Sequence, residues 1–313
     1  MKNVKAQSRI ATGCAFLLLI SSLSSAHPSV GLQQQVSTAD WKSVEQALGK
    51  AGSMQPGDVY KVSFPRSDLK ITAAGVELKP AFALGSWVAF KRMGDITVVM
   101  GDLVLTENEV NPVLSKLQQG GVEITALHNH VLNESPRVMY MHIHAMGDAA
   151  VIARAIHDAL VLTKTPFAVS ASTASVEIGI DTKQIDQIMG QNGKVNGGVY
   201  QFSIARADEI TDMMGDHKMP IPAAMGLAQG INFQPTGAGK AAITGDFVLL
   251  ASEVSPVIKA LRENGIEVSA VHSHMLTENP RLFFMHFWAN DDALKLARGL
   301  RAALDKVDVI RKM

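Results

Sequence analysis

Seven of the ten histidines of the chain lie in two short windows, residues 128–144 and 272–288. The first window holds His128, His130, His142 and His144 with Glu134 among them, and the second holds His272, His274 and His286 with Glu278. Imidazole nitrogens are common ligands of transition metals, and three histidines with an open coordination position form a frequent catalytic zinc site. The windows therefore predict a divalent transition metal, with zinc as the first expectation and copper as the second.

The spacing within each window suits a metal site on a β-hairpin. Side chains two positions apart on a strand project from the same face, so His128 and His130 are expected about 6.5 to 7 Å apart at their α-carbons. If the hairpin pairs position 130 with 142, and therefore 128 with 144, the histidines of the second strand join that face. A register slipped by one residue would send them to the opposite face. Convergence of the imidazoles thus depends on the hairpin register.

A carboxylate accompanies each group of histidines. Glu134 lies at the turn of the predicted hairpin, and Glu278 holds the corresponding place in the second window. Either side chain can be a further ligand or the catalytic base that takes a proton from a metal-bound water. His144 corresponds to Trp288, so the second window keeps three histidines, and the first is favoured if only one site is active.

Three functional hypotheses fit these residues and stay open. One is a metal-assisted hydrolase, which needs an open coordination position in a cleft. Another is a non-catalytic protein that binds a metal or an unidentified small molecule. The third is an interaction module in which the histidines form a hydrogen-bonded interface between two parts of the chain. That hypothesis requires every imidazole nitrogen to be paired with a protein group.

The two windows belong to an internal duplication. Residues 101–160 align without a gap to residues 245–304, an offset of 144 positions with 27 identities in 60. Earlier parts match more loosely, with 40–52 resembling 181–193 and 57–60 resembling 197–200. We therefore predict one repeat unit at residues 38–165 and a second at 180–306, each of ordinary domain size.

Hydrophobic periodicity predicts the elements that position the histidines. Residues 95–105 and their copy at 242–250 alternate like strands, and Asn111-Pro112 and Ser255-Pro256 resemble helix starts. Residues 123–131 and 137–145 are expected to be paired strands, and Asp148 is expected to cap a second helix. Asp102 and Asp246 each follow a glycine inside a predicted strand, a pattern typical of a bulge.

The order of these elements is strand, helix, strand, strand, helix, with extra strands before it. It predicts an α+β fold, a tandem duplication in which the helices cover one face of each sheet and the two units are related by a pseudo-twofold axis. The free face of each sheet must meet either water or the other copy.

The first 26 residues have the pattern of a signal peptide. A basic head (Lys2, Lys5 and Arg9) precedes a mostly apolar run at 10–20, and Ser24-Ser25-Ala26 supplies the small residues of a cleavage site. We therefore expect a periplasmic or secreted protein. No later segment has 18 consecutive apolar residues, so no membrane span is expected after cleavage. The formal net charge is zero and no basic stripe is present, which argues against a nucleic-acid partner.

The second copy carries a set of short motifs. They are Gly-Asp-Phe-Val-Leu at 245–249, Glu-Val-x-Pro-Val at 253–257, Gly-Ile-Glu-Val at 265–268, His-Ser-His-Met-Leu at 272–276 and the run from Pro280 to Trp288. With these motifs the chain resembles the LppY/LpqO family of exported bacterial proteins. The first copy departs from the pattern at 138–140 and at His144. The resemblance implies export and a repeated domain of unknown function, and it implies no reaction.

Overall fold

The computed structural model describes residues 41–168, 178–214 and 217–310. They belong to one compact unit, Ser37–Met313. The predicted signal peptide, residues 1–26, lies outside the described residues.

Each repeat is built on a six-stranded antiparallel sheet. In the first repeat the strand order is β1 (Ser53–Gln55), β2 (Val59–Pro65), β5 (Gly85–Met93), β6 (Ile96–Thr106), β9 (Val138–Gly147) and β7 (Glu123–His128). In the second it is β10 (Lys194–Asn196), β11 (Val199–Ala205), β14 (Ala228–Gly237), β15 (Lys240–Leu250), β17 (Leu282–Asp292) and β16 (Glu267–His272). The two sheets therefore have the same order of equivalent strands.

Short elements connect these sheets. Strands β4 (Val76–Glu77), β3 (Thr72–Ala73) and β8 (Glu134–Ser135) form a small sheet, and β12 (Thr211–Met214) pairs with β13 (His217–Pro220). A short helix α2 (Pro80–Ala83) precedes β5, and a single 3-10 turn, η2 (Ala223–Met225), holds the equivalent place before β14.

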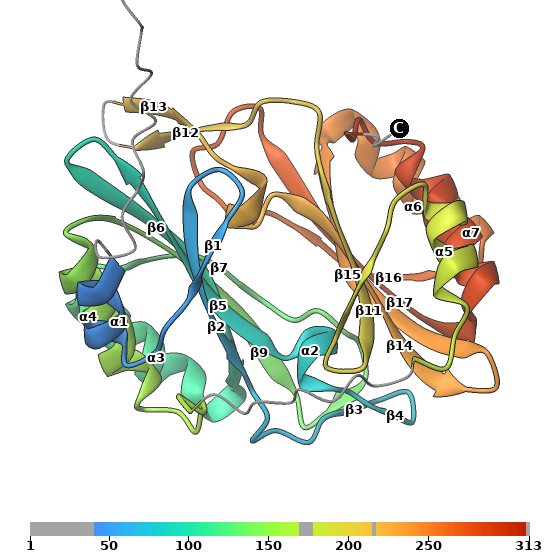
Figure 1. The fold of residues 1–313 in the computed structure, drawn as a ribbon, viewed down its shortest axis with the longest axis horizontal. Helices are drawn as coiled ribbons and strands as arrows, with labels where there is room; N and C mark the ends of the chain where they lie inside the picture. The colour runs from blue at the N-terminus through green and yellow to red at the C-terminus, as the bar shows by residue number, and fades with distance from the viewer. Residues whose placement is uncertain (1–40, 169–177, 215–216, 311–313) are drawn as a thin grey trace, which may run out of the picture. The chain divides into compact units, whose positions relative to one another are not determined.

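Three helices cover one face of each sheet. They are α1 (Lys42–Leu48), α3 (Glu107–Gln119) and α4 (Ala149–Leu160) in the first repeat, and α5 (Thr182–Met189), α6 (Ala251–Glu263) and α7 (Ala293–Leu304) in the second. The helices of each repeat lie on the side of its sheet that faces away from the other sheet (Figure 1). The predicted α+β class and tandem repeat are confirmed, whereas the twofold axis stays a prediction. Helices α1 and α5, which begin the two repeats, were not predicted.

The first long helix of each repeat begins earlier than predicted. Helix α3 starts at Glu107, and Pro112 lies inside it. Its start is fixed by the Glu109 carboxylate, which accepts a hydrogen bond from the Thr106 N–H at 2.8 Å, as the third residue of a capping box does. In α6, Glu253 accepts the same bond from the Leu250 N–H at 2.7 Å. The predicted start at Asn111 was therefore wrong, whereas the cap of α4 by Asp148 is confirmed.

Side chains on the two faces of the central strands belong to different hydrophobic cores. In β9, Met141, Ile143 and Ala145 pack into the core beneath the helices of the first repeat. Residues of the opposite sheet faces form two further cores, and both contain side chains from the two repeats: Val98 with Val248 in one, Tyr140 with Trp288 in the other. The free face of each sheet therefore packs against the other copy.

Glycine allows close backbone approach beside Asp102 and Asp246. A Cβ atom at Gly101 would lie 2.9 Å from the Trp87 carbonyl oxygen, and one at Gly245 would lie 1.8 Å from the Gly230 carbonyl oxygen. The pairing of β6 with β9, and of β15 with β17, runs through these positions without a register shift. The predicted bulges at Asp102 and Asp246 were therefore wrong, and the glycines are needed for close packing instead.

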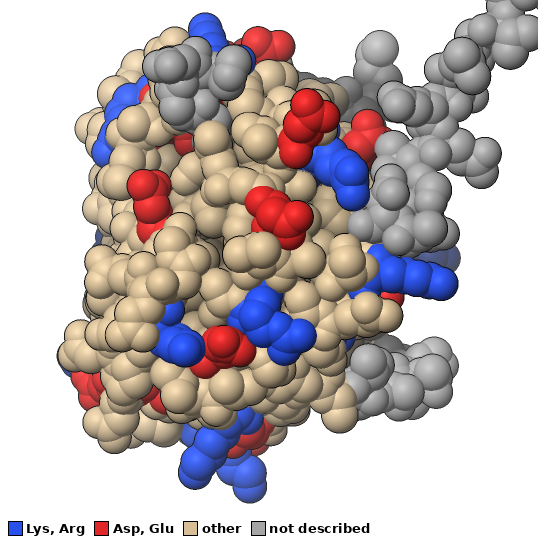
Figure 2. All heavy atoms as spheres, turned by 90° about the vertical axis from the view of Figure 1, so that its left-hand side faces the viewer, with Lys and Arg blue, Asp and Glu red and all other residues tan. Residues whose placement is uncertain are grey.

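Charges of both signs are mixed on the face that Figure 2 shows, where lysine and arginine lie among aspartate and glutamate without forming a continuous band. Of the helices in the described part of the chain, none combines the length and the hydropathy needed to cross a bilayer.

Candidate metal centre

The hairpin strands bring the histidines of each window together, although the strands do not pair position 130 with 142 as considered from the sequence. Position 142 pairs with Ala126, and His128 pairs with Tyr140, after a register shift between Ile124 and Ala126. His130 follows the end of β7. For Tyr140 and His142 the pairing differs from the predicted one by four positions, and an even difference keeps a side chain on its face. His128 and His142 therefore still share a face, with ring centroids 5.0 Å apart. Beyond the shift His144 pairs with Glu123, five positions from its predicted partner.

The two windows meet each other across the boundary between the repeats. The ring centroids of His128 and His272 are 3.6 Å apart. His130 lies against His286 at 3.8 Å, and His142 lies against His274 at 3.5 Å. Under the 144-residue offset these last two contacts exchange with each other. Six histidines from both copies therefore form one group, which we call the histidine cluster: His128, His130, His142, His272, His274 and His286.

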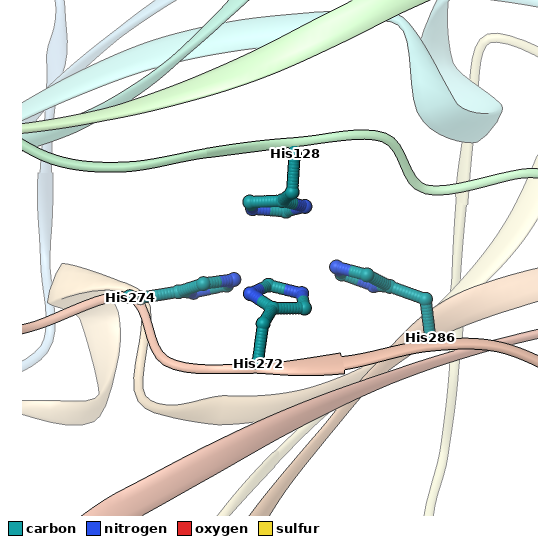
Figure 3. Close-up of side chains that lie close together, drawn as sticks. All are labelled: His128, His272, His274 and His286. Carbon is teal, nitrogen blue, oxygen red and sulfur yellow. The ribbon is translucent and has the colours of Figure 1, made fainter.

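Two sets within the histidine cluster have nitrogens close enough to hold a metal ion. One set comprises His128, His272, His274 and His286, and the other comprises His128, His130 and His142; in each, the candidate ligand atoms lie within 4.8 Å of one another. Figure 3 shows the first set, in which His128 approaches from one repeat and three histidines from the other. The predicted convergence of three imidazoles in the first copy is confirmed, and the structure adds a set that spans both copies.

The Nε2 atoms of all six cluster histidines are buried, and within the described residues none has a hydrogen-bond partner. Several Nδ1 atoms do have acceptors nearby: His286 Nδ1 lies 3.0 Å from the Gly245 carbonyl oxygen, and those of His128 and His272 lie 3.4 Å from backbone oxygens. An unpaired buried nitrogen costs free energy, and a metal ion removes that cost by accepting its lone pair. The histidines do lie between the two copies, as the third hypothesis expects, but it also requires every nitrogen to be paired with protein, and these Nε2 atoms are not.

Two aspartates lie beside the cluster, one from each copy. Asp246 Oδ1 is 2.8 Å from His286 Nδ1, and Asp102 Oδ1 is 3.9 Å from His142 Nε2. A carboxylate on the Nδ1 side of a histidine orients its Nε2 toward a metal and makes that nitrogen a stronger ligand. From the sequence, a bulge was favoured at these residues over a ligand role. An acidic residue at the same place in two otherwise apolar strands was the available signal.

Burial sets the protonation of most cluster histidines. It lowers the pKa of His142 to about 3, against the charge of Asp246, and lowers the pKa of His272 to about 4. The pKa values of His130 and His274 are also held well below the usual range by burial and by neighbouring histidines. Neutral imidazoles present lone pairs with no proton to displace, which favours metal binding.

The pKa values of His286 and of the two aspartates are shifted in other ways. Burial opposes protonation of His286, but the charge and hydrogen bond of Asp246 raise its pKa above the usual value. Burial and the nearby Asp246 raise the pKa of Asp102 to about 8. Burial also opposes ionisation of Asp246, but the neighbouring His286 lowers the pKa of Asp246 below its ordinary value. The two equivalent carboxylates are therefore in different protonation states near neutral pH.

The family profile described as "Domain of Unknown Function (DUF1259)" matches this chain twice, at residues 42–162 and 183–306. The chain belongs to this family. The histidine cluster thus lies between two DUF1259 domains, and each match contains one histidine window. Among curated proteins, none matches the chain.

Solved structures offer only distant similarity. A trimeric bacterial microcompartment shell protein, PduB, is 12% identical, with 84% of this chain and 97% of that one covered and a TM-score of 0.21. EtuB from Clostridium kluyveri is 11% identical, with 82% and 91% covered and a TM-score of 0.19.

The predicted carboxylates of the two DUF1259 domains lie in the connecting loops and bond to backbone there. Glu134 accepts a hydrogen bond from the Val138 N–H at 3.1 Å, and Glu278 accepts one from the Leu282 N–H at 3.0 Å. Neither is a member of the two sets of converging ligand atoms. Their role as a catalytic base stays a prediction.

His144 is also outside both sets. Its Nδ1 lies 3.5 Å from Glu123 Oε2, and its side chain lines a separate cavity with Met100 and Met275. Its predicted role as a ligand stays a prediction.

Proposed function

We propose that this DUF1259 protein binds a divalent transition metal, zinc in the first place, in the histidine cluster between its two domains. The observation that carries the proposal is the set of six buried Nε2 atoms with no hydrogen-bond partner in the described part of the chain. Zinc accepts three or four imidazole nitrogens in a tetrahedral arrangement, and both sets supply that number. Copper is the second candidate because it also binds imidazole.

The site has an open side. A cavity of about 390 Å³ is lined by His142 and His274, together with Asp102 and Asp246. A bound divalent metal lowers the pKa of a coordinated water and so generates a nucleophile near neutral pH. The cavity favours metal-assisted hydrolysis over a closed carrier site, which would need no space beside its ligands. Asp102 is placed to move a proton there, since it lines the cavity and lies 3.9 Å from His142.

We further propose that the protein acts after export, in the periplasm or outside the cell. The signal-peptide pattern of residues 1–26 and the similarity to the LppY/LpqO family support this placement. Loss of the first 26 residues from protein recovered from the periplasm, measured by intact mass, would test it.

Metal content tests the proposed centre. Untagged protein, purified without chelators, should carry close to one equivalent of a transition metal by plasma mass spectrometry. His128→Ala should lose most of it, because His128 belongs to both sets. The matched control is His157→Ala, which removes a histidine of α4 that packs against Phe167 outside the cluster. Wild-type protein that contains no metal and takes none up on titration would refute the centre.

A further inference from the structure

The cavity beside the histidine cluster contains a lysine whose counterpart in the other repeat is uncharged. Lys61 lies on β2, in a stretch where Tyr60 and Val62 pack beneath the helices and Lys61 faces the opposite side. It lines the cavity with His142 and His274. The alignment of residues 57–60 with 197–200 makes Gln201 its counterpart.

Lys61 is held in place by neutral groups, and although burial lowers its pKa to about 8, the ammonium group is protonated at neutral pH. Its Nζ lies 3.7 Å from the centre of the Trp87 ring and donates to the Ala224 carbonyl oxygen at 3.3 Å. Among the described residues it has no carboxylate within ion-pair distance; Asp102 acts on it only at longer range. A cation fixed over an aromatic face, beside a carbonyl and next to a cavity, is ready to bind an anion.

The corresponding position in the second repeat is closed. Gln201 donates to the Ala81 carbonyl oxygen at 2.7 Å and to Asn232 at 2.9 Å. Gly230, which pairs with Asp246 as Trp87 pairs with Asp102, supplies no ring. The shared core on that side is filled by Phe82, Tyr140 and Trp288. The duplication has therefore kept histidines in both copies, and the pair of His142 and His274 adjoins a cavity that contains a cation.

The cavity is lined by Lys61 and by two aspartates, Asp102 and Asp246, and each aspartate lies within ion-pair distance of a cluster histidine. The Asp246 carboxylate is engaged by His286 at 2.8 Å. The metal of the proposed centre adds positive charge at the far wall. Trp87, Met225 and Phe284 supply apolar surface to the same cavity. At about 390 Å³ the cavity falls within the range of roughly 300–1,000 Å³ that is usual for small-molecule sites.

We propose that this cavity binds a small molecule with a carboxylate or phosphate group, and that Lys61 holds the oxyanion while the rest of the ligand extends toward His142 and His274. The inference rests on the proposed metal centre, because it assigns the ligand class of the cavity beside that centre. Lys61 is a binding residue in this assignment and takes no part in bond breaking.

Calorimetric titration of the full-length, metal-loaded protein tests the assignment, with inorganic phosphate in one arm and benzoate in the other. Lys61→Gln installs the residue of the second repeat and should weaken binding of the preferred anion at least tenfold. Lys91→Gln is the matched control, because Lys91 also donates to a carbonyl oxygen, that of Gly57, but lies at the surface. It should bind within twofold of wild type. Phosphate binding alone would identify a phosphate ligand, and benzoate binding a carboxylate with an apolar body.

Two outcomes would overturn the anion site: neither anion binds to wild type, or both bind equally well to wild type and Lys61→Gln. Metal content is measured on the same samples, so the two proposals fail separately. If the protein contains metal but its anion binding does not depend on Lys61, the metal centre is supported and the anion site is refuted. If the protein takes up no metal but its anion binding depends on Lys61, the metal centre is refuted and the anion site is supported.

Discussion

At the scale of single residues, the buried carboxylates of the site region fall into two groups. Asp102 and Asp246 contact cluster histidines, and their pKa values shift in opposite directions. Glu134 instead holds the backbone of its loop through the Val138 N–H. The first group can affect metal binding directly, whereas Glu134 is expected to affect the stability of the loop.

Glu134→Gln should alter the pH dependence of stability. Burial raises the pKa of Glu134 to about 7, although the Val138 hydrogen bond and Arg137 oppose the shift. The folded protein therefore keeps a proton that the unfolded chain releases near its ordinary pKa of 4.5, so wild type loses stability as pH rises from about 4.5 to about 7. Glutamine can still accept the Val138 bond and cannot ionise. In urea unfolding, the free energy of unfolding of the variant should rise relative to that of wild type as pH increases from about 4.5 to about 7.

Glu278→Gln is the matched control for this measurement. Glu278 bonds to the Leu282 N–H in the same way, but it also lies 3.3 Å from an Arg281 nitrogen. Its replacement removes an ion pair and should not reproduce the gain. A constant difference between Glu134→Gln and wild type from pH 4 to pH 8 would contradict the prediction.

At the scale of elements, each sheet is tied to its first long helix by a buried arginine. Arg66 bonds to Glu109 of α3 at 2.9 Å and to the Val104 carbonyl oxygen of β6 at 2.6 Å. Arg206 makes the same bonds to Glu253 of α6 and to the Val248 carbonyl oxygen, each at 2.7 Å. These glutamates are also the residues that fix the helix starts. One ion pair therefore sets both the position and the beginning of the helix.

Arg66→Met should destabilise the protein by about 3 kcal/mol, because it leaves the Glu109 carboxylate and the Val104 carbonyl without their buried partner. Arg137→Met is the control. Arg137 lies 3.8 Å from Glu107, and both side chains are more than 60% exposed. Its loss should cost less than about 0.5 kcal/mol. Urea denaturation of both variants gives the comparison, and equal losses of stability would refute the role assigned to Arg66.

The hairpins show how far local pattern predicts this fold. Alternation separates Met141 and Ile143 from His142, because a strand has period two whatever its partner, and the first two do pack beneath the helices. It did not give the register. The pairing of β7 with β9 shifts between Ile124 and Ala126. The extra strand β8 in the loop pairs with β3, which lies far earlier in the chain. The convergence survived because the register differed by an even number of residues.

At the scale of the whole molecule, the centre exists only where two domains meet. Contacts such as His130 with His286 depend on how the free faces of the two sheets pack, which no spacing within a window encodes. The sequence therefore predicted two separate sites, whereas the structure has one cluster. A metal bound to His128 together with His272 links the domains directly.

Because ligands come from both domains, metal binding should stabilise the folded molecule as a unit. A ligand that binds only the folded state contributes about 2.7 kcal/mol when its free concentration is one hundred times its Kd. For a chain of 313 residues that corresponds to a rise in Tm of about 4 to 5 °C. Differential scanning calorimetry of chelated and zinc-loaded wild type should show this rise in one transition.

Two variants decide whether that rise comes from the histidine cluster. In His128→Ala it should disappear, since His128 is the one residue present in both sets of ligands. In His157→Ala it should remain, because the α4 histidine contacts Phe167 and not the cluster. A rise of the same size in His128→Ala would place the stabilising metal elsewhere. Two separate transitions, with only one moved by zinc, would mean that the metal is held by a single domain and does not link the pair.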